Sequence, residues 1–376
     1  MGYMYICRYR DMTIVHILCE KMINRARRGV MSKVNSSPLR ILVVPPSERL
    51  PSFQIGIKLP FDELQARGEI EYKTLPEYDV TEQDLCEANV IVFLRNTTTE
   101  SLRLLKAAQS EGIPVVYSID DHFLHLPKRG FGITMAEPER RFTFTSFLKK
   151  ADMIRVGSPY FAELIREEYN NNVCCIQASV DFSLIEPPVP KTRNSQGLII
   201  GYEGSAKEND FTVIIPALQE VLRKYGKEIR LEFHGFVPAE LLAHRRAVYF
   251  AGGREYKQYL PFLCGRAWDF GIAPLEDTLY NRCKSNNKFR EYSACGIPGI
   301  YSRMPTYSDC VQHEITGLLV EHTSEAWVEA ISRLIEDEPL RLRIREQATL
   351  FARSHYTVAR CASEWRQMLL SLEGIR

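Results

Sequence analysis

The sequence predicts an α/β protein with two doubly wound, Rossmann-like domains, each a parallel sheet covered by helices on both faces. Short apolar strands alternate with amphipathic helices from about residue 40 onward, as in a sheet that is buried on both faces. A proline-rich stretch at 187–190 interrupts this alternation, which then starts again. The chain has 376 residues, which is enough for two domains that each have their own core.

The first predicted domain spans residues 40–186. β-branched and other apolar residues favour strands at 41–44, 70–73, 89–94, 114–119, 153–156 and 173–176. Helices are expected at 55–67, 82–87, 101–111, 140–150 and 160–168, and Gly112 stops the third of them. Residues 187–197, which begin Pro-Pro-Val-Pro, form the predicted linker.

The second predicted domain spans residues 198–376 and repeats the pattern. Strands are expected at 198–202, 230–233, 248–250, 269–273, 299–301 and 317–320. The clearest helices are 211–225, 325–335, 340–354 and 358–372, and the last of them is free to pack back on the first domain. Because ligands bind doubly wound sheets at the carboxyl ends of their strands, we expect the functional site in a cleft between the two domains.

Composition narrows the classes of function. The net charge of +1 gives no bias toward nucleic acid. Ten cysteines occur without a C-x-x-C pair or zinc-ligand spacing, so a cytoplasmic protein with reduced cysteines is the simplest interpretation. No apolar run approaches the roughly 20 residues of a membrane span.

Residues 1–39 form a distinct basic extension. Ile14, Val15, Leu18 and Met22 have helical spacing just before an Arg-x-Arg-Arg cluster. One interpretation is a short amphipathic helix that places residues 1–40 on the inner face of the membrane. The other is a leader without a fixed structure, which we prefer, because a short basic segment says little about membrane contact.

The strongest functional signal lies in residues 268–302. Their pattern predicts a buried strand, a polar loop, a helix that begins with lysines, a Gly-Ile-Pro turn and a second buried strand. Lys284 lies just before the helix and Lys288 in its first turn, and Ser285 or Asn286 is the expected cap. Cations there oppose the helix dipole unless an anion is bound, and a helix N-terminus binds phosphate well. A nucleotide or nucleotide-sugar site is therefore predicted.

Three further groups are candidates for the same site. Gly204, Ser205 and Lys207 follow the first strand of the second domain and suit a diphosphate, although a plain tight turn explains them equally well. They do not form the G-x-G-x-x-G fingerprint, which disfavours a nicotinamide cofactor. His234, Gly252 and Arg254 follow later strands, where contacts to the base or sugar are expected.

Asp120-Asp121-His122 ends a buried strand of the first domain. Paired carboxylates there can act as a base, bind hydroxyls or ligate a metal. Capping of the loop is an equally good explanation. The pair is not a D-x-D metal signature, and no metal is expected.

Several segments occur together in an order typical of a known family. They are Ile200-Gly-Tyr-Glu-Gly-Ser205, Ala273-Pro-Leu275, Lys284-Ser-Asn-Asn-Lys-Phe-Arg-Glu-Tyr292, Gly296-Ile-Pro298 and Thr316-Gly-Leu-Leu-Val320, preceded by Gly112-Ile-Pro-Val-Val-Tyr-Ser-Ile-Asp-Asp121. Through them the chain resembles the family 4 (group 1) glycosyltransferases with the GT-B fold, of the bacterial O-antigen and surface-polysaccharide type.

The resemblance implies a GT-B enzyme that transfers a hexose from a nucleoside-diphosphate sugar to a glycan, lipid-linked or other hydroxyl acceptor, with retention and without a metal. It places the donor in the second domain and the acceptor in the first. Glu291 matches the second of two family glutamates and is expected to bind the ribose. The position of the first family glutamate is occupied by Cys283 in this sequence. Without the resemblance, the sequence pattern predicts that Glu291 is a surface carboxylate.

The expected catalytic groups are Asp120, Asp121 and Lys284, with Lys284 and Lys288 neutralising the diphosphate. Two alternatives remain open: a nucleotide-sugar epimerase with the same fold, and a non-catalytic member that binds a nucleotide or glycan.

Overall fold

The computed structural model describes residues 38–127, 134–185, 197–205 and 207–373. In this part of the chain two six-stranded sheets form, and every strand pair in both sheets is parallel. The predicted α/β class with two doubly wound sheets is confirmed. The N-terminal extension, apart from its last two residues, and the linker, apart from Gly197, lie outside the described residues.

The first sheet has the strand order β2-β1-β3-β4-β5-β6. Its strands are β1 (Leu39–Val44), β2 (Ile70–Thr74), β3 (Val90–Leu94), β4 (Val115–Ser118), β5 (Met153–Val156) and β6 (Val173–Cys175). The apolar run of β3 is buried at every position, as expected for a central strand covered on both faces. The helices are α2 (Pro51–Phe53), α3 (Leu59–Ala66), α4 (Glu82–Glu87), α5 (Thr99–Ser110), α7 (Pro138–Lys150) and α8 (Pro159–Glu168), with a π-helical segment, Gln54–Lys58, joining α2 to α3.

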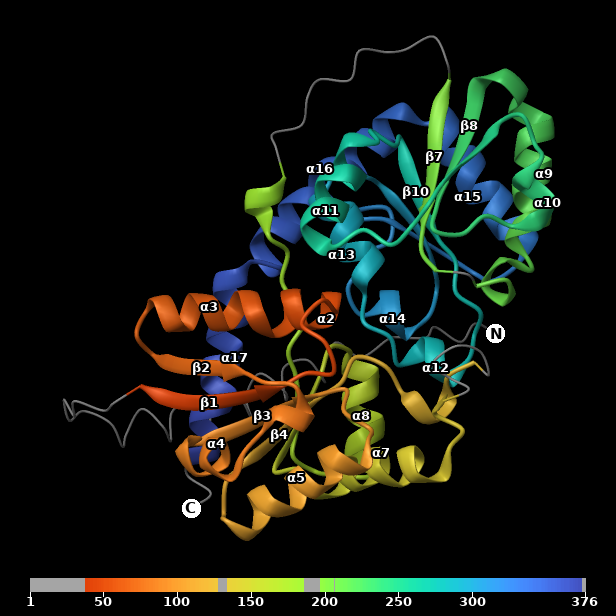
Figure 1. Cartoon of the computed structure of the whole chain (residues 1–376). Coiled ribbons are helices and arrows are strands. Elements are labelled where there is room, and N and C mark those ends of the chain that lie inside the picture. Colours follow the sequence, from red (N-terminus) through yellow and green to blue (C-terminus); the bar gives the residue numbers. More distant parts are fainter. Residues whose placement is uncertain (1–37, 128–133, 186–196, 206, 374–376) are drawn as a thin grey trace, which may run out of the picture. The chain divides into compact units, whose positions relative to one another are not determined.

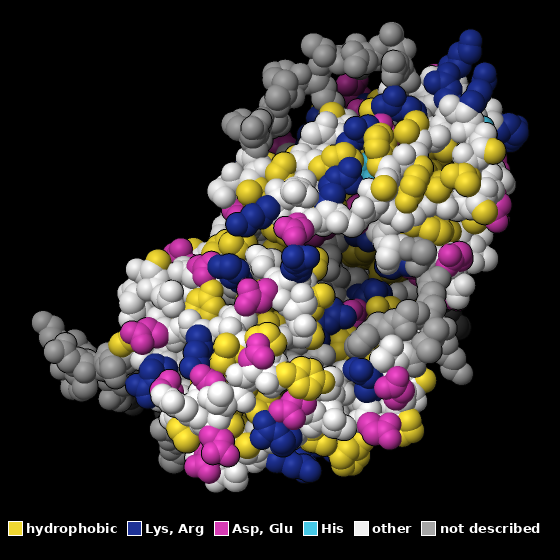
Figure 2. Space-filling model, in the orientation of Figure 1, with side chains coloured by type: hydrophobic (Ala, Val, Ile, Leu, Met, Phe, Trp, Pro, Cys, Tyr) yellow, Lys and Arg dark blue, Asp and Glu magenta, His cyan; other side chains and the backbone are white. Residues whose placement is uncertain are grey.

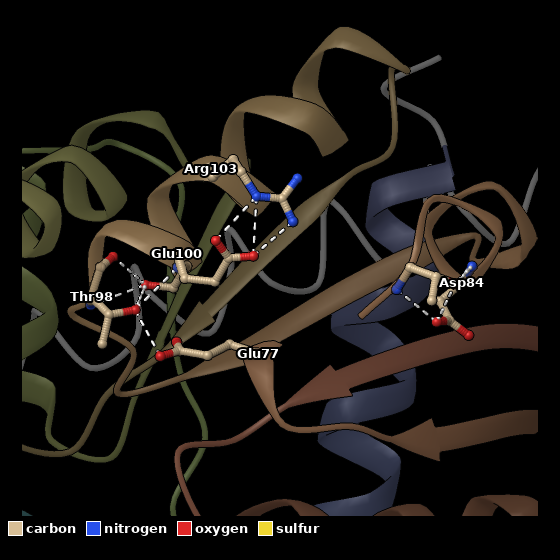
Figure 3. A network of polar contacts seen from close by, with 7 residues as sticks. Glu77, Asp84, Thr98, Glu100 and Arg103 are labelled. Atoms are coloured by element: carbon tan, nitrogen blue, oxygen red, sulfur yellow. Dashed lines mark hydrogen bonds and ion pairs between the residues drawn. The ribbon is translucent and has the colours of Figure 1, made fainter. Parts of the chain in front are cut away.

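A polar network fixes the start of α5 just after β3 (Figure 3). The Ser101 backbone N–H donates to Thr98 Oγ1 at 3.1 Å, and the Thr98 N–H donates back to Ser101 Oγ at 3.1 Å. Thr98 Oγ1 also donates to Glu77 Oε1 at 2.7 Å. This capping box holds the short loop between β3 and α5, in which Arg95 lies.

The second sheet has the order β12-β11-β10-β7-β8-β9. Its strands are β7 (Leu198–Glu203), β8 (Ile229–His234), β9 (Ala247–Phe250), β10 (Phe270–Ala273), β11 (Gly299–Ser302) and β12 (Leu318–Val320). The helices are α9 (Ile214–Tyr225), α10 (Ala239–Leu242), α11 (Tyr256–Gly265), α12 (Leu279–Arg282), α13 (Asn287–Ala294), α14 (Pro305–Ser308), α15 (Ser324–Glu336) and α16 (Glu338–His355). Helices α9 and α15 pack in one core of this sheet and α11 and α13 in the other, while α16 contributes residues to both (Figure 1).

Two strand glycines allow bulky rings to cover the second sheet. A Cβ atom at Gly201 would lie 1.8 Å from the Trp268 ring, and one at Gly271 would lie 2.5 Å from Tyr292 Cε2. Both rings are fully buried. Tyr292 belongs to the same helix as Lys288 and Glu291, so Gly271 sets how closely α13 approaches the sheet.

The C-terminal helix α17 (Val358–Glu373) packs on α3. Trp365 is fully buried in the core of the first sheet, and its indole N–H donates to the carbonyl of Gly56 at 2.8 Å. The last helix therefore leaves the second sheet and covers the first one.

Three findings concern the predicted environment and surface charge of the chain. The expectation of reduced cysteines is wrong for one pair, because Cys264 and Cys295 form a disulfide; the sequence spacing of 31 residues gave no sign of it. Within the described ranges, no helix is both long and apolar enough to cross a membrane. Cationic and acidic side chains are interspersed on the face seen in Figure 2, in keeping with the net charge of +1.

Candidate functional site

A cavity of about 280 Å³ brings together residues from the strand ends of both sheets. Its wall contains five cationic side chains, those of Arg95, Arg155, Lys207, Lys284 and Lys288, and three carboxylates, those of Asp120, Asp121 and Glu291. A larger, more open groove of about 580 Å³ lies along α9 and α15 and contains none of the predicted site residues. The smaller cavity is therefore the candidate site.

Three lysines from different segments converge on this cavity. Lys207 follows β7, Lys284 follows α12, and Lys288 lies in the first turn of α13. Burial, with the positive charges of Lys284 and Lys288, holds the pKa of Lys207 well below its usual value, although Asp210 lies 3.7 Å away. A bound anion would relieve this repulsion. The site is thus electrostatically suited to phosphate.

The expected helix cap is only partly realised. Asn286 occupies the N-cap position of α13, but its side chain makes no capping hydrogen bond and instead donates to the Tyr356 hydroxyl at 2.8 Å. Ser285 lines the cavity without capping the helix, and a Cβ at Gly157 would lie 2.3 Å from its hydroxyl. The free N–H groups of the first turn are therefore left without a side-chain cap, which favours an external anion.

Glu291 is buried, so the alternative of a surface carboxylate is wrong. Its side chain lines the cavity, and Tyr259 of α11 donates to its Oε2 at 2.9 Å. Burial raises the pKa of Glu291 to about 7, against the opposing effect of Arg290, and the nearby Glu203 adds to the increase. A carboxyl group that titrates near neutral pH and faces a cavity is typical of a functional site.

The carboxylates after β4 are held by an arginine that the sequence did not single out. Arg95 Nη1 lies 3.0 Å from Asp120 Oδ1, and its Nη2 lies 3.4 Å from Asp121 Oδ2. Lys284 Nζ lies 3.8 Å from Asp121 Oδ1. Burial raises the pKa of Asp120; for Asp121, Lys284 and Arg95 outweigh burial and hold the pKa below its usual value. The two neighbouring carboxyls therefore have different proton affinities.

Arg95 has a φ angle of 60°, a left-handed conformation that is uncommon for a residue other than glycine. Such backbone strain tends to occur at functional sites. The only sequence signal was the place of Arg95 at the end of a buried strand. Arg155, a second missed residue, is a charged residue inside the apolar strand β5 and is almost fully buried.

The third residue of the Asp120-Asp121-His122 segment belongs to the core. The His122 ring is buried and stacks on Phe161 with a centroid distance of 5.3 Å. Burial lowers its pKa to about 4, so the ring is neutral at physiological pH.

Six predicted donor residues lie outside the cavity wall: Gly204, Ser205, His234, Gly252, Arg254 and Asn286. His234 is buried at 3% exposure, between Trp268 and Phe250, and its pKa is lowered to about 4 by burial. Arg254 lies 3.6 Å above the Phe262 ring and donates to the Ala251 carbonyl. The buried His234 ring is used in packing among aromatic rings, whereas the exposed Arg254 side chain lies over the Phe262 ring.

The glycines among these residues lie close together. A Cβ at Gly235 would lie 2.6 Å from the Gly204 carbonyl oxygen, and one at Gly252 would lie 3.0 Å from the Gly235 Cα. The chain therefore needs small residues here for contacts between backbones.

Cys283, which stands where the resembling family has a glutamate, points into the first core. It is fully buried among residues of that core, and burial raises its pKa to about 12. It does not line the cavity. The neighbouring Lys284 does, so the chain turns from core to cavity between these two residues.

Comparisons with known proteins agree with this architecture. Residues 288–351 match the family model described as glycosyl transferases group 1. No protein of curated function matches the sequence.

Solved structures match over nearly the whole chain. HepE from Anabaena, in complex with UDP-glucose, is 15% identical with a TM-score of 0.65, over 89% of this chain and all of that one. Sucrose-phosphate synthase from Thermosynechococcus elongatus is 14% identical with a TM-score of 0.64, over 90% of this chain and all of that one. A glycosyltransferase from Rickettsia africae is 12% identical with a TM-score of 0.61, over 89% of this chain and 99% of that one.

At these identities the structural likeness establishes the fold. The segment matched by the family model begins at Lys288 and contains Glu291, so it includes the α13 part of the cavity wall. The chain has the GT-B fold, and its group 1 segment together with that fold supports a glycosyltransferase.

Proposed function

We propose that the cavity binds a nucleoside-diphosphate sugar and that the protein transfers the hexose to a hydroxyl acceptor. The observation that carries this proposal is the convergence of Lys207, Lys284 and Lys288 at the uncapped N-terminus of α13. Burial and the charges of Lys284 and Lys288 lower the pKa of Lys207, and a bound anion would stabilise the three cations together. A diphosphate is such an anion.

The same groups suit the chemistry of donor cleavage. When the bond between the sugar and the diphosphate breaks, negative charge grows on the leaving diphosphate. Cations and backbone N–H groups that are already in place stabilise this charge without rearrangement. Glu291, one turn further along α13, is the proposed ligand of the ribose hydroxyls.

The acceptor is proposed to enter on the Asp120 and Asp121 side of the cavity, which belongs to the first sheet. We propose residues 40–186 as the acceptor domain and 198–376 as the donor domain. Asp121, whose pKa is lowered, is the better candidate to accept a hydrogen bond from an acceptor hydroxyl. An acceptor of the O-antigen or surface-polysaccharide kind, retention and independence from metal ions are carried over from the resemblance, and a cytoplasmic location is carried over from the cysteine pattern.

The test is incubation of the protein with a panel of nucleotide sugars, with and without glycan acceptors, followed by product analysis. Transfer or slow donor hydrolysis by the wild type, lost in Lys284→Ala and Glu291→Ala and unchanged by EDTA, supports the proposal. Conversion of the donor sugar without an acceptor would identify an epimerase. Binding of the nucleotide without turnover of any donor would identify a non-catalytic protein.

A further inference from the structure

A tyrosine outside the cavity wall links a carboxyl group in the wall to one behind it. The Tyr259 hydroxyl lies 2.9 Å from Glu291 Oε2 and 3.0 Å from Glu203 Oε2. Both distances are those of hydrogen bonds. Glu291 lines the cavity, whereas Tyr259 and Glu203 do not.

Hydrogen counting shows that this trio holds an extra proton. A phenol has a single hydrogen to donate, and an ionised carboxylate only accepts. If both carboxyls were ionised, one of the two close contacts would join an oxygen to an oxygen with no hydrogen between them. Two full hydrogen bonds at these distances require that one carboxyl is protonated and donates, which gives the trio a charge of −1 in place of −2.

We propose that Tyr259 is a positioning residue that, with Glu203, holds the Glu291 carboxyl in a proton-sharing trio, so that nucleotide binding strengthens as the trio releases its proton to solvent. The inference rests on the proposed function, in which Glu291 binds the ribose hydroxyls. An ionised carboxylate accepts hydrogen bonds from hydroxyls more strongly than a protonated carboxyl does. Tyr259 thus acts on the ligand only through Glu291.

The surroundings of Glu291 agree with a proton that is lost near neutral pH. Burial raises the pKa of Glu291 to about 7; the charge of Glu203 raises it further, while Arg290, Lys288 and the hydrogen bond from Tyr259 lower it. Arg290 Nη2 lies 4.0 Å from Glu291 Oε1. Four other tyrosines face the trio: Tyr256 of α11, Tyr307 of α14, Tyr202 of β7 and Tyr292 of α13, the last of which accepts from the Glu203 backbone N–H.

The disulfide joins the two helices that carry Tyr259 and Glu291, whereas Glu203 ends strand β7. Cys264 lies at the end of α11, which presents Tyr259, and Cys295 directly follows α13, which presents Glu291. The covalent link limits how far the two helices can separate. It therefore also limits how far the Tyr259 hydroxyl can move from the Glu291 carboxyl.

The experiment measures the affinity for UDP-glucose against pH by calorimetry. UDP-glucose is the probe because its diphosphate is esterified at both ends and does not titrate near neutral pH. In the wild type, affinity should rise with pH through a midpoint close to 7, the value for Glu291. Tyr259→Phe removes a hydrogen bond to the ionised form and should move the midpoint up by about one pH unit, whereas Glu203→Gln removes a like charge and should move it down by about the same amount.

Opposite shifts in the two variants distinguish positioning from a structural role, which would lower stability and leave the midpoint in place. Tyr249→Phe, a change at an exposed tyrosine of β9, is the matched control and should leave the midpoint unchanged. Infrared titration of the Glu291 carboxyl, taken as the difference between wild type and Glu291→Gln, gives the midpoint without a ligand.

If UDP-glucose binds and neither variant shifts the midpoint, the inference fails while the proposed function stands. If UDP-glucose does not bind but the infrared midpoint shifts in opposite directions in Tyr259→Phe and Glu203→Gln, the proton-sharing trio stands and its role in nucleotide binding fails.

Discussion

Replacing Lys284 by alanine tests the electrostatic basis of the site. The Lys284 ammonium lies 3.8 Å from Asp121 Oδ1 and 4.1 Å from the centroid of the Tyr280 ring, and its side chain is 16% exposed. In the free protein it therefore has one long ion pair and one cation–π contact, which together contribute about 1–2 kcal/mol to folding. The variant should still fold.

The effect on nucleotide binding should be larger. A hydrogen bond to a charged group is worth about 1.5–3 kcal/mol, and part of this gain is offset because Lys284 must share its charge with Asp121. Taking the lower half of that range gives a loss of roughly 1.5–2 kcal/mol, or a Kd for UDP about 10- to 30-fold weaker.

The assay is calorimetric titration with UDP at constant ionic strength, together with a thermal melt of each variant. Lys224→Ala is the matched control, since Lys224 of α9 is 49% exposed and forms an ion pair with Glu336 away from the cavity. It should change the Kd by less than about twofold. If Lys284→Ala binds UDP as tightly as Lys224→Ala does, the lysine cluster is not the diphosphate site.

Other substitutions test the packing that supports the site. Gly201→Ala should prevent folding at physiological temperature, because the new Cβ would lie 1.8 Å from the Trp268 ring; circular dichroism of the variant checks this. Trp365→Ala should lower the free energy of unfolding by about 3–5 kcal/mol, measured by urea denaturation, because the side chain is fully buried in the core. Reduction of the disulfide between Cys264 and Cys295 should cost up to roughly 3–4 kcal/mol by the chain-entropy relation for its 31-residue separation. Reductant should therefore lower the melting temperature of the wild type and leave that of a Cys264→Ser, Cys295→Ser double variant unchanged.

The fold followed from the sequence because its signals are local. An apolar strand such as 90–94 is recognisable from its own residues, and so is each amphipathic helix. Lys284 and Lys288 were found for the same reason: their effect on a helix N-terminus depends only on a few neighbouring positions.

The missed features depend on residues that are distant in sequence. Arg95 reaches Asp120 across 25 positions, and Tyr259 reaches Glu203 across 56. The burial of Glu291 and the packing of His234 among aromatic rings arise in the same way, from helices and strands that meet only in the folded chain. Periodicity shows which face of a helix is apolar, but it does not show which distant carboxyl or arginine will lie against that face.

A crystal structure of the protein with UDP-glucose is the most direct test of the central claim. We predict diphosphate oxygens within hydrogen-bond distance of Lys284 and Lys288, and ribose hydroxyls at the Glu291 carboxyl. A diphosphate bound elsewhere on the chain, with the three lysines left in solvent, would contradict the assignment of the site.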